Sequence, residues 1–182
     1  MIKNISKNMH PSRKSTEFLE KEIVYEATRS TGPGGQHRNR VATAIRATHK
    51  ATKISAMATE RRSQLENKSE ALFRLRRKLA INYRSPITNE DLCSPALYQP
   101  SELWLKRLKG RKIKVSSTHI DFPAILAEVL DRLQVDNDEV KNTATAFRIS
   151  TTQLIKFLAI DGHVLNALNE RRKTKKLKPL KA

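Results

Sequence analysis

Residues 29–40 hold the side chains in this sequence that could carry out chemistry together. Gly32, Gly34 and Gly35 supply three of the chain's five glycines, and Gln36 and a run of basic residues follow at once. Glycine reaches positive φ without a steric penalty, so Gly34-Gly35 predicts a loop that folds tightly or approaches a ligand closely. The flanking arginines indicate that this ligand carries phosphates.

This loop is neither of the two common phosphate-binding loops. No Gly-Lys-Ser/Thr follows it, which excludes a P-loop, and the spacing of the Rossmann fingerprint is absent as well. As bare composition, Gly-Gly-Gln is more often a turn than a site. The context of the loop must therefore decide between the two.

The net charge of the chain is +18, with a pI near 10.4. Residues 1–114 contain 25 Lys/Arg against 10 Asp/Glu, residues 115–170 contain four against eight, and residues 171–182 contain seven against none. A balance this basic favours an anionic partner, either a nucleic acid or a membrane surface. A merely soluble cationic protein is the less informative alternative.

Several classes of protein are disfavoured by what the sequence lacks. The single cysteine, Cys93, excludes an internal disulfide framework and a Cys cluster for zinc, so we expect no metal and no cofactor. No run approaches the roughly 18–20 apolar residues of a membrane span. Residues 1–14 show no apolar stretch typical of a secretory signal. We expect a cytoplasmic protein that does not bind a membrane.

The elements around the loop predict a small α+β domain over residues 20–85, after a flexible basic N-terminus over residues 1–19. Alternation over residues 22–28 predicts a strand, and residues 39–46 could form a short helical face. Two β-compatible runs, residues 45–48 and 53–58, then predict a hairpin. The clearest helix covers residues 59–82, with an apolar stripe made by Leu65, Leu72, Leu75 and Leu79.

The second half predicts a linker over residues 86–117, a small all-helical module over 118–170 and a basic tail over 171–182 that is too charged to pack. In the linker, Trp104 lies among cations and could either stack on a base or anchor the chain to a core. Asp121 and Ser150 are expected helix caps. The helices near residues 138–159 have a helix-turn-helix rhythm, but their acidic balance favours packing or protein docking over DNA binding.

Three segments in order resemble the catalytic domain of the class I peptide chain release factors, over roughly residues 20–82. The first is the glycine loop, the second follows it, and the third opens the long helix. The matching residues are Gly32-x-Gly34-Gly35-Gln36-His37-x-Asn39, then Thr43-Ala44-Ile45-Arg46-x-Thr48-His49, then Glu60-x-Arg62-Ser63-Gln64-x-x-Asn67-x-x-x-Ala71-x-x-x-Leu75. Arg40 and Val41 depart from the family, where lysine and threonine are usual.

The resemblance implies hydrolysis of the ester between a nascent peptide and its tRNA on the ribosome. Such a reaction needs a water at the carbonyl and a donor for the developing oxyanion, and a preorganised backbone N–H is a suitable donor. The catalytic residues implied are Gly34 and Gly35, which permit the conformation, and Gln36, whose N–H meets the transition state and whose side chain shapes the water pocket. No general base from the protein is implied, and for His37 we favour packing or an RNA contact.

The expected partners are peptidyl-tRNA and the rRNA of the large subunit at the peptidyl transferase centre, bound by a monomer. The basic tail could also enter the mRNA channel, as in short rescue factors of this family. Phosphate contacts of this kind give affinity and positioning rather than sequence reading. The expected RNA-binding residues are Arg29, His37, Arg38, Asn39, Arg40, Arg46, Arg171, Arg172, Lys173, Lys175, Lys176 and Lys178.

Only about 20 residues precede the resembling region, so we expect codon-independent release or ribosome rescue rather than stop-codon reading. Two alternatives remain at this point. The first is an RNA-binding protein that keeps the fold without hydrolysis, which the intact Gly-Gly-Gln disfavours. The second is a nucleic-acid regulator using the helix-turn-helix rhythm, which the charge distribution disfavours.

Overall fold

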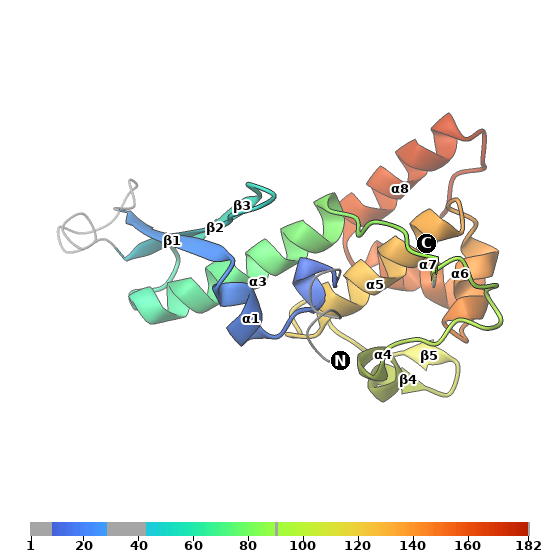
Figure 1. The fold of residues 1–182 in the computed structure, drawn as a ribbon, viewed down its shortest axis with the longest axis horizontal. Helices are drawn as coiled ribbons and strands as arrows, with labels where there is room; N and C mark the ends of the chain where they lie inside the picture. Colours follow the sequence, from blue (N-terminus) through green and yellow to red (C-terminus); the bar gives the residue numbers. More distant parts are fainter. Residues whose placement is uncertain (1–8, 29–42, 90, 182) are drawn as a thin grey trace. The chain divides into compact units, whose positions relative to one another are not determined.

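The computed structural model describes residues 9–28, 43–89 and 91–181 of the 182-residue chain (Figure 1). The chain divides into two compact units, Met1–Tyr83 and Arg84–Ala182. Within the described residues, no helix is both long and apolar enough to cross a bilayer.

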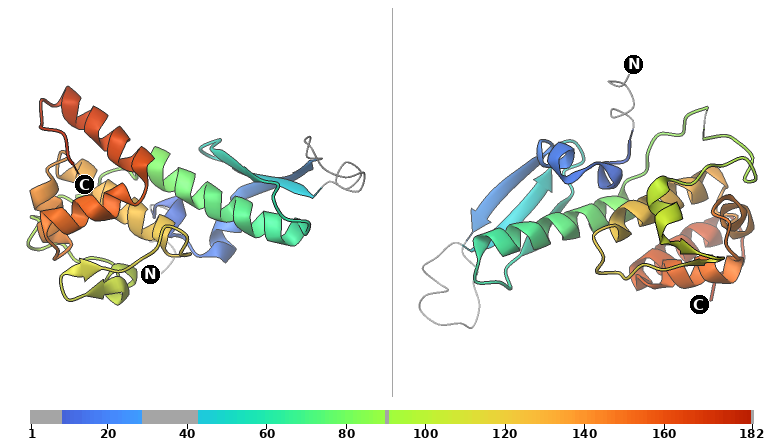
Figure 2. Two further views of the ribbon diagram at one scale, coloured as in Figure 1. Left: turned by 180° about the vertical axis from the view of Figure 1, so that it is seen from behind. Right: turned by 90° about the horizontal axis from the view of Figure 1, so that it is seen from below.

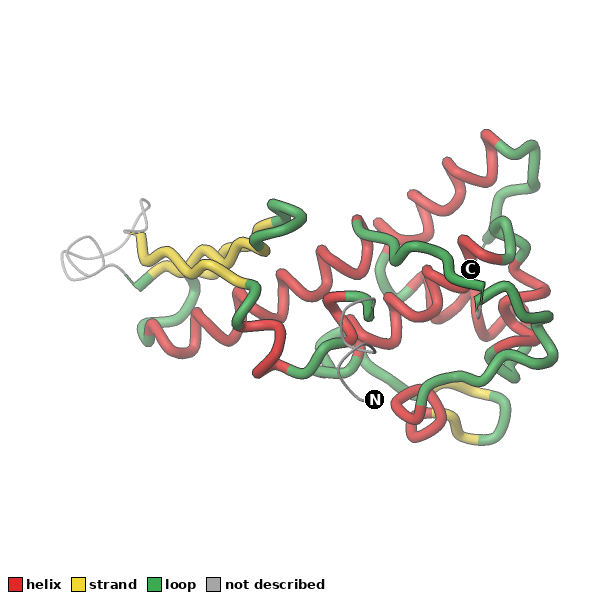
Figure 3. The backbone as a smooth tube through the Cα atoms, viewed as in Figure 1, coloured by secondary structure: helices red, strands yellow, loops and turns green. Residues whose placement is uncertain are grey.

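The first unit is a three-stranded antiparallel sheet with one long helix against it. The strands β1 (Ile23–Thr28), β2 (Ala44–His49) and β3 (Ser55–Ala58) lie in the order β1-β2-β3, and α3 (Gln64–Asn82) covers one face (Figures 2 and 3). The predicted α+β class is therefore confirmed, as are the first strand and the hairpin.

The expected helical face over residues 39–46 is wrong where the structure describes it. Ala44, Ile45 and Arg46 belong to β2, the central strand, which pairs with β1 on one side and β3 on the other. Pairing on both edges satisfies the backbone of these residues, which a short isolated helix cannot do.

The core of this unit lies between the sheet and α3. Ile23 and Ile45 from the strands pack with Leu72, Leu75 and Leu79 from the helix. Ser63 caps α3 by accepting a hydrogen bond from the Glu66 N–H, so the helix begins five residues later than Thr59. Leu65, predicted to be in the apolar stripe, is instead 74% exposed. Burial along α3 starts only at Asn67, so Leu65 precedes the part of the helix that the sheet covers.

The N-terminal segment is folded where the structure describes it. This corrects the expectation that the N-terminus is flexible over residues 1–19. A 3-10 turn, η1 (Pro11–Arg13), and a short helix, α1 (Thr16–Glu20), precede the sheet. The buried Ser12 donates a hydrogen bond of 2.7 Å to the Arg76 carbonyl, and the Arg76 guanidinium returns one of 2.9 Å to the Ser12 carbonyl. These reciprocal bonds attach the segment to α3. Residues 1–8 lie outside the described residues.

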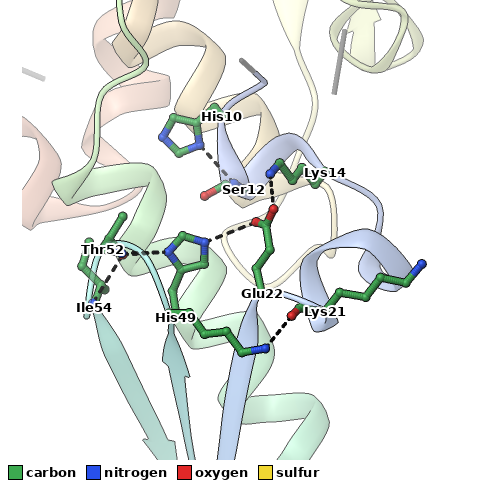
Figure 4. A network of polar contacts seen from close by, with 9 residues as sticks. His10, Ser12, Lys14, Lys21, Glu22, His49, Thr52 and Ile54 are labelled. Atoms are coloured by element: carbon green, nitrogen blue, oxygen red, sulfur yellow. Dashed lines mark hydrogen bonds and ion pairs between the residues drawn. The ribbon is translucent and has the colours of Figure 1, made fainter. Parts of the chain in front are cut away.

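A polar network joins the N-terminal segment to the β2–β3 turn (Figure 4). Lys14 Nζ forms an ion pair with Glu22 Oε1 at 2.5 Å. The other carboxylate oxygen of Glu22, Oε2, lies 3.3 Å from His49 Nε2. The other ring nitrogen of His49 lies 2.9 Å from the Thr52 hydroxyl in the turn. Partial burial by itself raises the pKa of Glu22, but the hydrogen bonds with Lys14 and His49 outweigh it and hold that pKa below its ordinary value.

Because the pKa of Glu22 is lower in the folded state, its contribution to stability is present above its unfolded pKa and disappears as the pH falls through the folded one. We expect Glu22→Gln to lower the free energy of unfolding at pH 7 by less than about 1 kcal/mol, since the pair is partly exposed. The difference from the unmodified chain should shrink as the pH falls below the ordinary glutamate pKa and vanish once the pH is below the lowered folded-state pKa. Urea unfolding at several pH values measures this, with the exposed Glu26→Gln as control; a difference that does not shrink as the pH falls below the ordinary glutamate pKa would contradict the assignment.

The second unit is a group of four helices with a short helix and a two-stranded hairpin beside them. Its elements are α4 (Glu102–Arg107), β4 (Leu108–Lys109), β5 (Lys112–Ile113), α5 (Phe122–Val135), α6 (Val140–Ala146), α7 (Thr151–Ala159) and α8 (Gly162–Thr174). Helices are thus present over the predicted 118–170 region. Ser150 caps α7 as expected, whereas Asp121 occupies the cap position of α5 without a side-chain cap bond.

Residues 101–117 are part of this unit, which corrects the prediction of a linker over 86–117. Trp104 is fully buried, its ring lies 4.4 Å from that of Phe147 between centroids, and its Nε1–H donates to the Phe147 carbonyl. The anchoring role of Trp104 is therefore correct and base stacking is excluded, because no face of the indole is open. A buried aromatic with a satisfied polar atom fixes α4 to the helices.

Candidate catalytic loop and RNA-contacting residues

The predicted catalytic loop joins the ends of β1 and β2. Thr28 ends β1, Ala44 begins β2, and these two residues are partners in the antiparallel register. The loop therefore leaves and re-enters the sheet at neighbouring positions. Residues 29–42 lie outside the described residues, and with them the following predicted site residues: Gly34, Gly35, Gln36, Arg29, His37, Arg38, Asn39 and Arg40.

Thr43, the first described residue after the loop, is bonded to Asn67, a fully buried residue of α3. Its amide nitrogen donates bonds of 2.7 Å to the Thr43 carbonyl and 2.9 Å to the Arg61 carbonyl, and its oxygen accepts one of 3.0 Å from the Arg61 N–H. One carboxamide thus provides the hydrogen-bond partner of three backbone groups. Asn67 connects the residue before β2 to α3 and to the segment that precedes α3.

Sequence reasoning placed Asn67 in the family resemblance but not among the functional residues. One signal could have identified it. Asn67 lies four and eight residues before Ala71 and Leu75, so it occupies a position of the buried stripe of α3. A polar side chain on a buried stripe must find hydrogen-bond partners, and backbone groups near the helix start are the nearest ones.

Arg46 is the one loop-proximal RNA-binding candidate that the structure describes. It is exposed in the middle of β2, opposite Glu26 on β1 and Met57 on β3. Its contact with RNA stays a prediction. On α3, Arg74 bonds to both Glu60 and Glu70 at 2.9 Å, so this arginine is committed to ion pairs. In the part of the chain with described coordinates, no group of three or more His, Cys, Asp or Glu side chains could hold a metal ion.

The predicted basic tail is packed over its first residues, which corrects the expectation that residues 171–182 cannot pack. α8 continues to Thr174. The buried carboxylate of Asp138 lies 2.5 Å from the Arg171 guanidinium and 2.7 Å from Lys175 Nζ. Arg172 is itself buried and donates to the Asp138 carbonyl and, at 2.9 Å, to the Lys178 carbonyl. Repulsion among these cations is offset by an acidic residue 33 to 37 positions earlier.

The turn between α5 and α6 presents Asp138 to the tail. Asn137 and Asp138 both have positive φ, +54° and +64°, a conformation that short polar residues tolerate better than others. Further along, Asn169 exchanges two hydrogen bonds with the backbone of Leu180, at 3.0 and 2.8 Å. The segment after α8 therefore folds back on the helix. Lys173, Lys176 and Lys178 remain exposed, and their RNA contacts stay predictions.

Comparison with known proteins shows what the first unit is similar to. Residues 12–93 match the RF-1 domain. The chain is 46% identical over 65 residues to peptide chain release factor PrfB1, chloroplastic, of Arabidopsis thaliana, and this region is 36% of the chain and 14% of that protein. It is 44% identical over 63 residues to peptide chain release factor 2 of Helicobacter pylori, which is 35% of the chain and 17% of that protein.

A third relative, peptide chain release factor 1 of Symbiobacterium thermophilum, is 35% identical over 75 residues, or 41% of this chain. The aligned regions span only 14% to 21% of the length of these three relatives. The likeness therefore lies in one domain. Residues 12–93 thus match the RF-1 domain, and the chain is similar to peptide chain release factors over part of its length.

Proposed function

We propose that this protein hydrolyses the ester bond of peptidyl-tRNA on the ribosome, as a cytoplasmic monomer. The observation that carries the proposal is the place of Gly34-Gly35-Gln36 within the RF-1 domain match, in the connection between paired ends of two strands. The alternative that Gly-Gly-Gln is an ordinary turn explains neither the sequence likeness nor the buried Asn67 that secures the loop's base.

In the proposed reaction, water attacks the ester carbonyl and the oxyanion develops against the Gln36 backbone N–H. A fixed donor of this kind stabilises the transition state without reorganising during the reaction. The Gln36 side chain shapes the water pocket, and Gly34 and Gly35 allow the backbone to reach the required conformation. The ribosome and the terminal ribose of the tRNA supply the remaining groups, so the protein needs no general base.

Binding in this proposal is electrostatic. Residues 1–83 contain 18 Lys/Arg against seven Asp/Glu, which suits a partner made largely of phosphates. Arg46 and the basic residues of the loop would contact rRNA of the large subunit at the peptidyl transferase centre. Such contacts position the loop and carry no sequence information.

The finer proposal is that release does not depend on a stop codon, as in ribosome rescue. Its support is that the RF-1 domain match ends at residue 93 and leaves most of the second unit, with its own fold, outside it. The exposed Lys173, Lys176 and Lys178 would then contact RNA, including the mRNA channel. Because Arg171, Arg172 and Lys175 are engaged with Asp138, they would contribute to that contact only if the end of α8 rearranged.

One assay tests this function and its codon dependence together. Ribosomes carrying labelled peptidyl-tRNA in the P site are prepared with a truncated mRNA, a stop codon or a sense codon in the A site. We expect release on the truncated mRNA at a rate no lower than on the stop codon. Release only with a stop codon would overturn codon independence but keep the hydrolase. Binding without release on any ribosome would favour the alternative, a non-hydrolytic RNA-binding protein that retains the fold.

A further inference from the structure

The basic run from Lys106 to Lys114 forms a folded element in the second unit, outside the catalytic domain. α4 ends at Arg107, and β4 and β5 follow as a hairpin connected by Gly110 and Arg111 (Figure 1). Five of the run's six cations are exposed, and Glu102 is the only acidic residue in the sequence between positions 101 and 120. We call these five the hairpin surface: Lys106, Lys109, Arg111, Lys112 and Lys114.

The hairpin surface is attached to a rigid base. Trp104, buried among aromatic rings, fixes α4, and Arg107 donates to Asp121 at 2.6 and 3.1 Å. The Lys114 N–H donates to the Arg107 carbonyl at 3.0 Å, which ties the end of the hairpin to the end of α4. Gly110 has a φ of +59°, as a tight hairpin turn requires at its first central position. The sixth cation, Arg107, is thus structural, and the other five remain at the surface.

The lysines of the hairpin lie on one side of it. Lys112 and Lys114 are exposed and alternate with Ile113 and Val115, which are half-buried. Lys109 is the register partner of Lys112 across the two strands. Like charges directly opposite each other on a sheet are destabilising. Within the described part of the chain, neither Lys109 nor Lys112 has an ion pair that would offset this repulsion.

We propose that the hairpin surface binds the phosphate backbone of RNA, as a second contact apart from the catalytic loop. An anionic partner relieves the repulsion between Lys109 and Lys112, and lysine binds phosphate as a point charge. Trp104, the only aromatic residue of the element, is fully buried, so no aromatic ring of this element is available to stack on bases, and lysines facing the backbone phosphates make up most of the surface. The choice of RNA among polyanions rests on the proposed function, whereas the cationic surface itself does not.

An anionic membrane is the competing partner. Membrane-surface elements combine a basic face with a continuous apolar one. Within residues 101–120, all of which the structure describes, the large exposed apolar side chains are two, Leu105 at 41% and Ile120 at 62%, and neither belongs to β4 or β5. This arrangement favours the phosphates of RNA, and the experiment includes vesicles.

The test compares two double variants of the full chain, Lys109→Ala/Lys112→Ala and the matched control Lys141→Ala/Lys156→Ala, which removes two exposed lysines from α6 and α7. The probe is a fluorescent mixed-sequence RNA hairpin, titrated at several salt concentrations. We expect the first variant to bind on the order of tenfold more weakly at 0.1 M salt, with a salt slope lower by about 0.7 to 0.9 per lysine. The control variant should match the unmodified chain.

Thermal unfolding guards against misfolding as the explanation. Because Lys109→Ala/Lys112→Ala removes a like-charge pair, its melting temperature should be equal to or above that of the unmodified chain. Equal RNA affinity in both double variants would overturn the proposal. It would also be overturned if Lys109→Ala/Lys112→Ala weakened binding to phosphatidylserine vesicles but left RNA binding unchanged. A chain carrying Gln36→Ala should keep the hairpin-dependent binding, so failure of the proposed hydrolysis and failure of this RNA contact are distinguishable.

Discussion

Replacing Gln36 is expected to reduce peptide release more than any other single change in this chain, and the choice of replacement separates two roles. Gln36→Ala keeps the backbone N–H and removes the side chain, so it tests the water pocket. Gln36→Pro removes the N–H, because proline has no backbone donor. Losing one oxyanion donor costs about 10²–10³ in rate. We therefore expect release to fall in the order unmodified chain, Gln36→Ala, Gln36→Pro.

The measurement is the rate of peptide release from ribosomes with a truncated mRNA, at saturating protein. Ribosome affinity is measured in parallel, and we expect it to change little because the phosphate contacts remain. Gln153→Ala, on α7 of the second unit, is the matched glutamine control. Gly35→Ala should also slow release if the loop requires positive φ there. Undiminished release by Gln36→Pro would exclude the backbone N–H from the mechanism.

Replacing Asn67 is expected to have the largest effect on stability and to weaken release as a consequence. Asn67→Ala leaves two carbonyls and one N–H without partners next to a fully buried position. Each buried unsatisfied group costs about 1–3 kcal/mol, and some regain water near the surface, so we expect a loss of about 2–4 kcal/mol in the free energy of unfolding. Thr43, at the base of the proposed catalytic loop, also loses its connection to α3.

Urea unfolding gives the stability, and release is measured well below the melting temperature, where the variant is folded. Asn82→Ala is the matched control, because Asn82 lies on the same helix, is exposed, and makes a single 2.9 Å bond to the Lys78 carbonyl. Asn67→Asp keeps the acceptor for Arg61 but faces two carbonyls with a carboxylate, so it should not restore stability. If Asn67→Ala and Asn82→Ala have the same free energy of unfolding, the three hydrogen bonds of the Asn67 carboxamide do not contribute to stability.

Local patterns predicted the main elements of the two units, but they did not predict η1, α1, α4 or the β4–β5 hairpin. Alternation identified β1, the β2–β3 hairpin followed from two short β-compatible runs, and the apolar spacing identified α3 and the helices of the second unit. These signals succeed because a half-buried strand and a half-buried helix each impose a fixed repeat on the apolar residues. The expected helical face was wrong at residues 44–46, where pairing with two neighbouring strands decides the conformation, whereas the β-compatible run over residues 45–48 was correct.

Burial was less predictable than secondary structure. Leu65 fits the stripe of α3 by spacing, yet it is exposed because the helix begins at Gln64 and burial starts later. Trp104 lies in a basic segment that suggested a linker, yet its ring packs on Phe147, 43 residues away. Neither outcome can be derived from nearby residues, since each depends on where a distant element lies.

The sequence by itself determined the chemistry-bearing motif, the charge balance and the family resemblance, because these depend on residue types and their order along the chain. Only the tertiary structure decided which polar residues are committed to the fold. Asn67 bonds to Thr43 at the base of the proposed catalytic loop, and Asp138 engages Arg171 and Lys175, which composition alone assigned to a free tail. Hydrogen bonds and ion pairs act over a few ångströms in space, and their partners here are 24 and 33 to 37 positions apart.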